Sequence, residues 1–236
     1  IVAANNLNNN PYTYKFTVVD SNQVNAFALP AGSVFITVPI IAMADSEAEI
    51  AGVLGHEIGH VTARHTAERM YVAKKEEGKS WLFGGVGAVI GAGAGYFLGS
   101  KLCQSGDTAC KSKYALYGGA AGGAGGLLVQ KYGFMKNSQE DELESDRVGF
   151  KYAVNAGYNK TQVGDFYTKL QKLEEQNKKG SSLTGWLTDA MSSHPPSKTR
   201  VAQAEELEKS IKTEGGISSS ADFKEMKALA QSLMKK

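Results

Sequence analysis

The sequence is poor in the residues that characterise several common classes of protein. Its 236 residues include two cysteines, two tryptophans, five prolines and four histidines. The formal net charge is +2, and the basic residues are spread along the chain and form no cluster in the sequence. Binding to nucleic acid is therefore not expected. Hydrophobic residues make up 42% of the chain, which is typical of a folded protein with a sizeable core. We expect one domain over residues 1–236.

Several motifs are also missing. There is no G-x-S-x-G motif, which argues against a serine hydrolase of that type. The cysteines Cys103 and Cys110 have neither C-x-x-C spacing nor a second pair, so a cysteine zinc site is not expected. They enclose a polar loop, which favours a disulfide, and therefore an oxidising compartment, over two reduced thiols. The chain begins at Ile1 without a signal-like segment, so we expect a processed or trimmed chain that lacks its targeting segment.

Charge is absent from two stretches rich in glycine and alanine, residues 81–100 and 114–130. Small residues allow helices to approach closely, so we expect a helical pair over residues 81–130, or a mobile glycine-rich region. The alternative is a membrane-inserted hairpin or a peripheral membrane contact through these residues. The first stretch is long enough to span a bilayer, whereas the second is short and weakly hydrophobic.

The most informative stretch that is present is His56-Glu57-Ile58-Gly59-His60, an H-E-x-x-H motif. Histidines four residues apart lie on one face of a helix, one turn apart, so both can bind a single zinc ion. Glu57 is adjacent to His56 and can take a proton from a zinc-bound water. The alternative is an amphipathic helix in which the histidines are incidental.

The surrounding sequence predicts a helix over residues 46–72. Ser46 begins a capping-box pattern with Glu49, and Asp45 is the alternative cap. Three glycines within this range would each cost about 1 kcal/mol relative to alanine. Such a cost is usually offset by the close approach of another backbone or of a ligand. We therefore expect a buried helix that its neighbours pack tightly.

The predicted fold class is α+β and mainly helical. Residues 12–38 alternate as β-strands do, and Pro30-Ala31-Gly32 is a turn signal that joins the last two strands as a hairpin. We expect a small antiparallel sheet packed on the H-E-x-x-H helix, with the strand at residues 33–38 forming an edge to which an extended substrate could add. Helical patterns follow at residues 138–156, 160–177, 197–213 and 220–235.

A catalytic zinc ion needs three protein ligands and an open position. The longer motif with a third histidine would place glycine at position 63 and histidine at position 66, where this chain has Ala63 and Thr66. His65 lies well round the helix from the motif, so we expect it at the surface. A carboxylate from a later helix is the remaining common solution.

The acidic run at residues 140–146 offers that carboxylate. Glu142 and Asp146 share one helical face, which would allow one to bind zinc and the other to orient a histidine ligand. Glu144 points to another face and is the second choice. The alternative is a solvated helix start, where acidic residues are favoured by the helix dipole.

Five segments, in this order along the chain, resemble the M48 peptidases. They cover roughly residues 20–210 and are Asn25-Ala-Phe-Ala-Leu-Pro-Ala-Gly-Ser-Val-Phe-Ile, His56-Glu-Ile-Gly-His-Val, Glu142-Leu-Glu-Ser-Asp-Arg, Ala156-Gly-Tyr and Ser193-His-Pro. The sequence is most similar to the soluble bacterial periplasmic branch, with its outer-membrane-associated quality-control proteases, and to Oma1-like peptidases.

The resemblance implies a zincin-like fold of the gluzincin type and a zinc endopeptidase that acts on unfolded, envelope or membrane proteins. It implies one zinc ion per chain and a location in the periplasm or at the outer membrane. Its motifs make Glu142 the third ligand beside His56 and His60, and Asp146 the partner of a histidine ligand. His194 is then expected near the metal, and Arg200 is matched to a later arginine of the family. Asn25 is a further candidate.

Three functions remain to be compared. In the first, Glu57 acts as general base in peptide hydrolysis, and His194 helps to stabilise the developing charge. In the second, His194 binds zinc in the resting state, and the chain is a latent zinc protein that acts as a chaperone or assembly factor. In the third, zinc is structural within a glycine-rich membrane module, which would leave Glu57 without a role.

Overall fold

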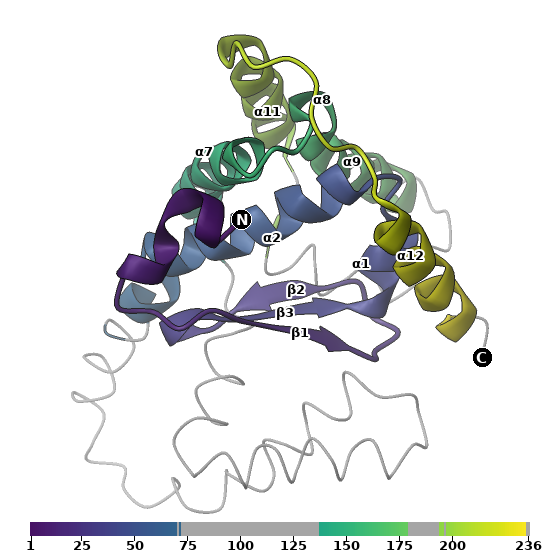
Figure 1. Ribbon diagram of the computed structural model, residues 1–236, viewed down its shortest axis with the longest axis horizontal. Helices are drawn as coiled ribbons and strands as arrows, with labels where there is room; N and C mark the ends of the chain where they lie inside the picture. Colours follow the sequence, from purple (N-terminus) through teal and green to yellow (C-terminus); the bar gives the residue numbers. More distant parts are fainter. Residues whose placement is uncertain (70, 72–136, 179–193, 196, 235–236) are drawn as a thin grey trace, which may run out of the picture. The chain divides into compact units, whose positions relative to one another are not determined.

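The computed structural model describes residues 1–69, 71, 137–178, 194–195 and 197–234 (Figure 1). The chain forms two compact units, one made of Ile1–Ala63 with Lys136–Lys236 and the other of Arg64–Met135. The helical pair, or membrane contact, expected over residues 81–130 and the Cys103–Cys110 disulfide lie outside the described residues. The single domain over residues 1–236 stays a prediction. All elements named below belong to the first unit.

The first unit contains a mixed sheet of three strands, β1 (Lys15–Val19), β2 (Ala26–Ala28) and β3 (Ser33–Thr37), in the order β1-β3-β2. β2 and β3 form the predicted antiparallel hairpin through the turn at Pro30–Gly32. β1 pairs with β3 in parallel, so the expectation of a purely antiparallel sheet was wrong. The reason is the strand order. β3 turns back antiparallel to β2 and inserts between β2 and β1, where it runs in the same direction as β1.

This strand order also corrects the expected substrate edge. β3 is paired on both sides, because β1 hydrogen-bonds to one edge and β2 to the other. An added strand needs a row of unpaired backbone groups, which only an edge strand has. The strand at residues 33–38 is therefore central and cannot accept a substrate by strand addition.

Two helices follow the sheet directly, the short α1 (Val38–Met43) and the long α2 (Glu47–Thr62). Ser46 is the N-cap of α2, as predicted, and its hydroxyl accepts a hydrogen bond from the backbone N–H of Glu49 at 3.2 Å. The helix ends earlier than predicted, because Arg64 adopts the left-handed conformation with φ 64°. Helical backbone resumes at residue 65, so the range 46–72 is not one continuous helix.

The glycines of α2 do allow another backbone to approach, as expected. A Cβ atom at Gly55 would lie 2.5 Å from the carbonyl oxygen of Gly149, and one at Gly52 would lie 2.1 Å from that of Val163. Any larger residue at these positions would force the helices apart. The small residues therefore bring α2 against the helix that contains Gly149.

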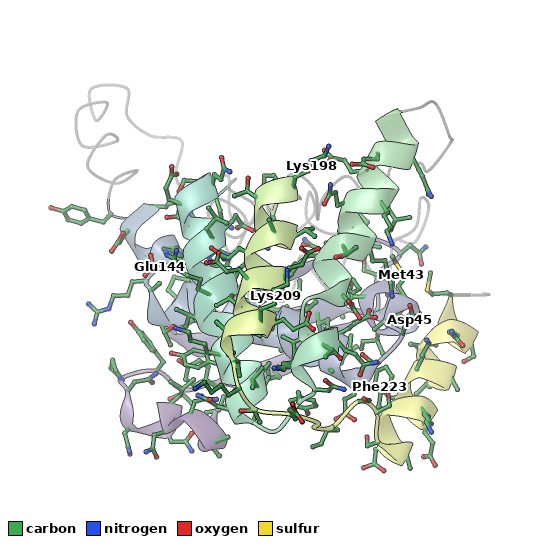
Figure 2. The ribbon with its side chains drawn as sticks, turned by 90° about the horizontal axis from the view of Figure 1, so that it is seen from above. Met43, Asp45, Glu144, Lys198, Lys209 and Phe223 are labelled. Carbon is green, nitrogen blue, oxygen red and sulfur yellow. The ribbon has the colours of Figure 1, made fainter. Side chains whose placement is uncertain are left out.

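Among the described residues of the first unit, α2 is followed by α7 (Gln139–Asn155), α8 (Lys160–Val163), α9 (Asp165–Lys178), α11 (Lys198–Ser210) and α12 (Ala221–Leu233). All of these except α12 form a layer on the side of α2 away from the sheet (Figure 1). Figure 2 shows α7, α11 and α9 side by side in this layer, with α11 in the middle. α12 packs instead against α1. The predicted helix at 160–177 is divided in two at Gly164.

The fold is mainly helical, as predicted, and α2 is buried between the sheet and the outer helices. One apolar cluster joins the sheet to α1, α2, α9 and α12, and a second joins α2 to α7, α9 and α11. Within the described residues, no helix combines the length and the apolar character needed to cross a bilayer.

Candidate metal centre

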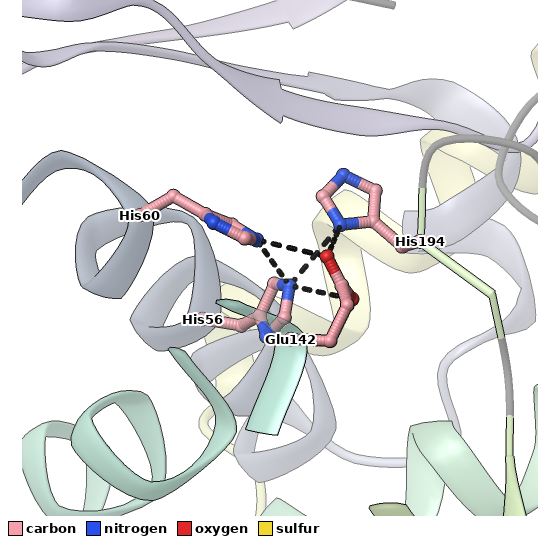
Figure 3. A group of neighbouring side chains, drawn as sticks. All are labelled: His56, His60, Glu142 and His194. Atoms are coloured by element: carbon pink, nitrogen blue, oxygen red, sulfur yellow. Dashed lines mark hydrogen bonds and ion pairs between the residues drawn. The ribbon is translucent and has the colours of Figure 1, made fainter. Parts of the chain in front are cut away.

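Four side chains from three parts of the chain meet in a buried cluster (Figure 3). His56 and His60 come from α2, Glu142 from α7, and His194 from the segment before α11. Each offers one nitrogen or oxygen atom, and these atoms all lie within 4.8 Å of one another. We refer to these four residues as the ligand cluster.

The geometry of the ligand cluster suits a small cation at its centre. Nε2 of His56 lies 3.0 Å from Nε2 of His60 and 3.2 Å from Nδ1 of His194. Oε1 of Glu142 lies 3.2 Å from Nε2 of His60 and 3.0 Å from Nδ1 of His194. Nitrogen and oxygen atoms from three parts of the chain therefore lie around one point.

Asp146 fixes the ring of His56. Its Oδ1 atom lies 2.7 Å from Nδ1 of His56, which leaves Nε2 of that ring directed into the cluster. A histidine ligand normally has its second ring nitrogen held by such a partner. The spacing of Glu142 and Asp146 on one face of α7 thus places both beside the cluster, one at its centre and one behind His56.

Arg200 connects the same carboxylates to the segment that carries His194. Its Nε and Nη2 atoms form hydrogen bonds of 2.6 and 2.7 Å with the two oxygens of Asp146. Nη1 lies 2.8 Å from Oε2 of Glu142 and donates to the backbone oxygens of His194 and Pro195 at 3.5 and 3.3 Å. Arg200 is 3% exposed, so these pairs are shielded from solvent.

Tyr167, which the sequence analysis did not single out, supports this network from α9. The guanidinium of Arg200 lies 4.9 Å from the centre of the Tyr167 ring, and the ring of His56 lies edge-on at 6.0 Å. Tyr167 belongs to the apolar face that predicted a helix at residues 160–177. Its neighbours at the site come from other helices, so helical periodicity alone could not have assigned it there.

Glu57 is buried beside the ligand cluster without joining it. Its side chain is on α2, next to His56, and only 2% of its surface is exposed. Oε1 lies 3.6 Å from Nε2 of His194, on the side of that ring opposite the cluster. Oε2 has no hydrogen-bond partner among the described residues. A buried carboxylate oxygen without a partner is costly, and it is typical of a group that acts on a ligand or a water.

Burial and charge pairing determine the protonation of the cluster. Burial, aided by His56, lowers the pKa of His60 well below its usual range, so its ring is neutral and can bind a metal. Burial alone would raise the pKa of Glu142 and Asp146. His194, His56 and Arg200 outweigh burial at Glu142 and hold its pKa well below the usual range, and Arg200 holds the pKa of Asp146 at about 2.

The pKa of His194 is raised, whereas that of His60 is lowered. Burial alone would lower its pKa, but the carboxylates of Glu142 and Glu57 outweigh burial and raise the pKa to about 9. The ring therefore bridges two carboxylates, with Nδ1 at 3.0 Å from Glu142 and Nε2 at 3.6 Å from Glu57. Binding of a metal to Nδ1 would require loss of a proton.

The donor set fits a zinc ion. Imidazole nitrogens with one carboxylate are a common set of protein ligands for catalytic zinc, and hard cations such as Mg²⁺ prefer oxygen ligands. Such a site also needs a partner that orients a histidine ligand, which Asp146 provides for His56, and an unprotonated ligand ring, which His60 provides. The residues present therefore suit zinc in both chemistry and arrangement.

Other residues considered from the sequence lie elsewhere. Glu144 is exposed on α7 and is not part of the ligand cluster (Figure 2). His65, expected at the surface, is 4% exposed, and it too is outside the cluster. Asn25 is fully buried at the start of β2, where its backbone pairs with Thr37. Its side-chain atoms have no hydrogen-bond partner among the described residues.

One residue at the centre of the site was missed. The side chain of Asn137 is buried, and its Nδ2 atom lies within hydrogen-bonding distance of His60, Glu142 and His194. Asn137 directly precedes the N-cap of α7, Ser138. The capping pattern of Ser138 with Asp141 could have pointed to it, because the residue before an N-cap commonly contacts the fourth residue of the helix.

Comparison with known proteins agrees with the site. The chain belongs to peptidase family M48, whose sequence pattern matches residues 1–208. It is 31% identical over 165 residues to the β-barrel assembly-enhancing protease of Yersinia pestis, which covers 70% of this chain and 29% of the relative. It is 28% identical over 202 residues to mitochondrial metalloendopeptidase OMA1 of Arabidopsis thaliana, covering 84% of this chain and 33% of the relative.

A third relative is metalloprotease LoiP of Escherichia coli, which is 30% identical over 171 residues. The match covers 72% of this chain and 56% of LoiP. This chain thus spans about a third of the length of the first two relatives and just over half of LoiP. The family assignment concerns the part that contains the ligand cluster, since residues 1–208 include all four of its members.

Proposed function

We propose that this chain is a zinc-dependent endopeptidase with a zincin-like fold of the gluzincin type. The observation that carries the proposal is the position of Glu57, which lies buried beside the ligand cluster and is not a member of it. A structural metal site needs no such carboxylate, whereas peptide hydrolysis needs a general base. We assign His56, His60 and Glu142 as the zinc ligands and Asp146 as the residue that orients His56.

The chemistry divides between the ion and the chain. Zinc, when bound, would activate a water molecule and polarise the scissile carbonyl. Glu57 accepts the proton of the attacking water and passes it to the leaving amine. Arg200 and Asp146 hold His56 and Glu142 in place, and burial excludes bulk water from these contacts. His194 can donate from Nε2 to a substrate oxygen when its ring is protonated.

His194 also supports a second function. Its Nδ1 atom joins the three assigned ligands, so four protein ligands would fill a tetrahedral site. Such a site has no position for water, and the chain would then be latent or would act as a chaperone or assembly factor for envelope proteins. Activity would require the segment that carries His194 to withdraw.

The relatives suggest where such an enzyme acts. Bacterial relatives from Yersinia pestis and Escherichia coli are named β-barrel assembly-enhancing proteases, which links those proteins to the assembly of β-barrels. We infer that this chain acts in the bacterial envelope, in the periplasm or at the outer membrane. Its substrates would be unfolded or misassembled envelope or membrane proteins.

The test is cleavage of casein by metal-free protein that has been reconstituted with one zinc ion per chain. Glu57→Gln at the same zinc content is the matched variant, because it keeps the size of the side chain and removes the base. We expect zinc-dependent cleavage by the wild-type chain and a loss of at least about a hundredfold in the variant. Full activity of Glu57→Gln would reject the assignment of the base.

The same assay would also reveal a latent chain, which binds zinc but does not cleave casein. If neither protein cleaves casein although both bind zinc, His194→Ala should be measured next. Cleavage by His194→Ala would show that His194 occupies the fourth position in the resting chain. Unchanged cleavage and unchanged zinc affinity in His194→Ala would exclude that role.

A further inference from the structure

Asn137 contacts Glu142 across the start of helix α7. Ser138 is the N-cap of α7, so Asn137 is the residue before the cap and Glu142 is the fourth residue of the helix. Side chains at these two positions pack on each other at many helix starts, where both are usually hydrophobic. Here both are polar, and they are 4% and 1% exposed. The contact between them is therefore a buried hydrogen bond rather than apolar packing.

The amide of Asn137 reaches three members of the ligand cluster. Its Nδ2 atom lies 2.5 Å from Oε1 of Glu142, and 3.3 Å from both Nε2 of His60 and Nδ1 of His194. The amide nitrogen has two hydrogens, so it can donate to Glu142 and to one ring nitrogen that lacks a proton. The carboxylate is the strongest acceptor because it is charged and nearest.

Glu142 is consequently held at both oxygens. Asn137 donates to Oε1, and Nη1 of Arg200 lies 2.8 Å from Oε2. A hydrogen bond at Oε1 and an ion pair at Oε2 together restrict the rotation of the carboxylate plane more than the hydrogen bond alone would. A carboxylate oxygen has two lone pairs, so Oε1 can accept from Asn137 and still bind a metal ion.

We propose that Asn137 is a positioning residue of the metal centre, which orients Glu142 and so raises the affinity of the site for zinc. The inference rests on the zinc site proposed above. Partners of this kind behind a ligand are worth about ten- to a hundredfold in metal affinity. The opposite role is that the amide competes with the metal for the same lone pairs, and removing it would then tighten binding.

The experiment measures the zinc affinity of Asn137→Leu by competition with a chromophoric chelator. Leucine is close to asparagine in size and suits the position before an N-cap, so the start of α7 is retained. We expect zinc binding about ten- to a hundredfold weaker than in the wild-type chain. Asn137→Ala, which removes the amide without adding bulk, repeats the test if leucine is not accommodated.

A second readout separates positioning from folding. The visible absorption of the Co²⁺-substituted chain reports the geometry of the ligands, and we expect its band positions to change in Asn137→Leu. The control is Ser138→Ala, which weakens the same helix start by removing its cap but keeps the amide. This control should bind zinc with wild-type affinity and give the wild-type Co²⁺ spectrum.

Three results would overturn the inference. They are zinc affinity of Asn137→Leu equal to or tighter than wild type, an unchanged Co²⁺ spectrum, and an equal loss of affinity in Ser138→Ala. Failure of the proposed function is distinguishable from these. A wild-type chain that binds no zinc would reject the metal site and this inference together, whereas the results above leave the site intact.

Discussion

Arg200 forms ion pairs with two buried carboxylates. Asp146 and Glu142 are 2% and 1% exposed, and the guanidinium pairs with both. Lysine could not replace it, because a single ammonium group cannot form the two-pronged contact with Asp146 and also reach Glu142. The charge of one side chain thus keeps two others ionised in a site that excludes solvent.

Replacing Arg200 by leucine should therefore destabilise the fold as well as the site. We expect a loss of about 3–5 kcal/mol in the free energy of unfolding, because two buried carboxylates lose their partner. Urea unfolding of the metal-free chain measures it. Arg147→Leu is the control, since Arg147 is exposed on α7 next to Asp146. Similar stability of the two variants would contradict this prediction.

A second residue pair predicts a dependence on pH. The phenol of Tyr158 donates to Oε1 of Glu47 at 3.1 Å, and burial together with this carboxylate raises the pKa of Tyr158 to about 12. In the unfolded chain the pKa is about 10. The folded state therefore keeps a proton that the unfolded state loses, and stability that is present below pH 10 declines as the pH rises to about 12.

The comparison of wild type with Tyr158→Phe isolates this effect. The wild-type chain should be the more stable below pH 10, and its advantage in the free energy of unfolding should shrink up to about pH 12. Urea unfolding at several pH values across this window gives the difference. An advantage that stays constant throughout would contradict the assignment.

Among the elements, the crossing of α2 and α7 decides the geometry of the site. A Cβ atom at Gly149 of α7 would lie 2.4 Å from the backbone nitrogen of His56. This contact sets how closely the ligand on α2 approaches Glu142 on α7. The glycines lower the intrinsic helix propensity, and the close packing of two backbones offsets that cost.

Gly149→Ala tests this crossing, because the two effects of the change have opposite signs. Without a clash, alanine in a helix would stabilise the chain by about 0.5–1 kcal/mol. The contact with His56 instead predicts a loss of about 1–3 kcal/mol and weaker zinc binding. Thermal and urea unfolding measure the sign, with Lys151→Ala on the exposed face of α7 as the control. Stabilisation by Gly149→Ala would show that the crossing can relax.

For the molecule as a whole, the site links segments that are far apart in the chain. The ligand cluster joins α2, α7 and the segment before α11, and Arg200 returns from α11 to the same carboxylates. The unfolded chain has no such arrangement, so a metal that binds here binds the folded state. Metal binding should consequently stabilise the whole of this unit.

Zinc should raise the free energy of unfolding by about 2.7 kcal/mol at a free concentration one hundred times its dissociation constant. Removal by a chelator should reverse the effect. Glu57→Gln should respond as the wild type does, because Glu57 is not in the ligand cluster. His60→Ala should not respond. Thermal unfolding against zinc concentration measures this, and equal shifts in His60→Ala and wild type would contradict the assignment of His60.

The features that could be predicted from the sequence arise from contacts between residues that are close to one another in the sequence. The helical period places His56 and His60 one turn apart, and Ser46 caps its helix through a residue three positions away. The turn at Pro30–Gly32 joins two adjacent strands. In each case the partners are separated by a few residues, so spacing and residue type carry the information.

The sequence by itself thus determined the H-E-x-x-H helix, the predominance of helices and the candidate residues for a metal site. Only the tertiary structure decided the parallel pairing of β1 with β3, the end of α2 near Arg64, and the places of Tyr167 and Asn137 beside the cluster. It also brought Glu142, which the sequence analysis had preferred to Glu144, to the histidines. These features depend on which elements pack together, and local periodicity carries no information about contacts between distant residues.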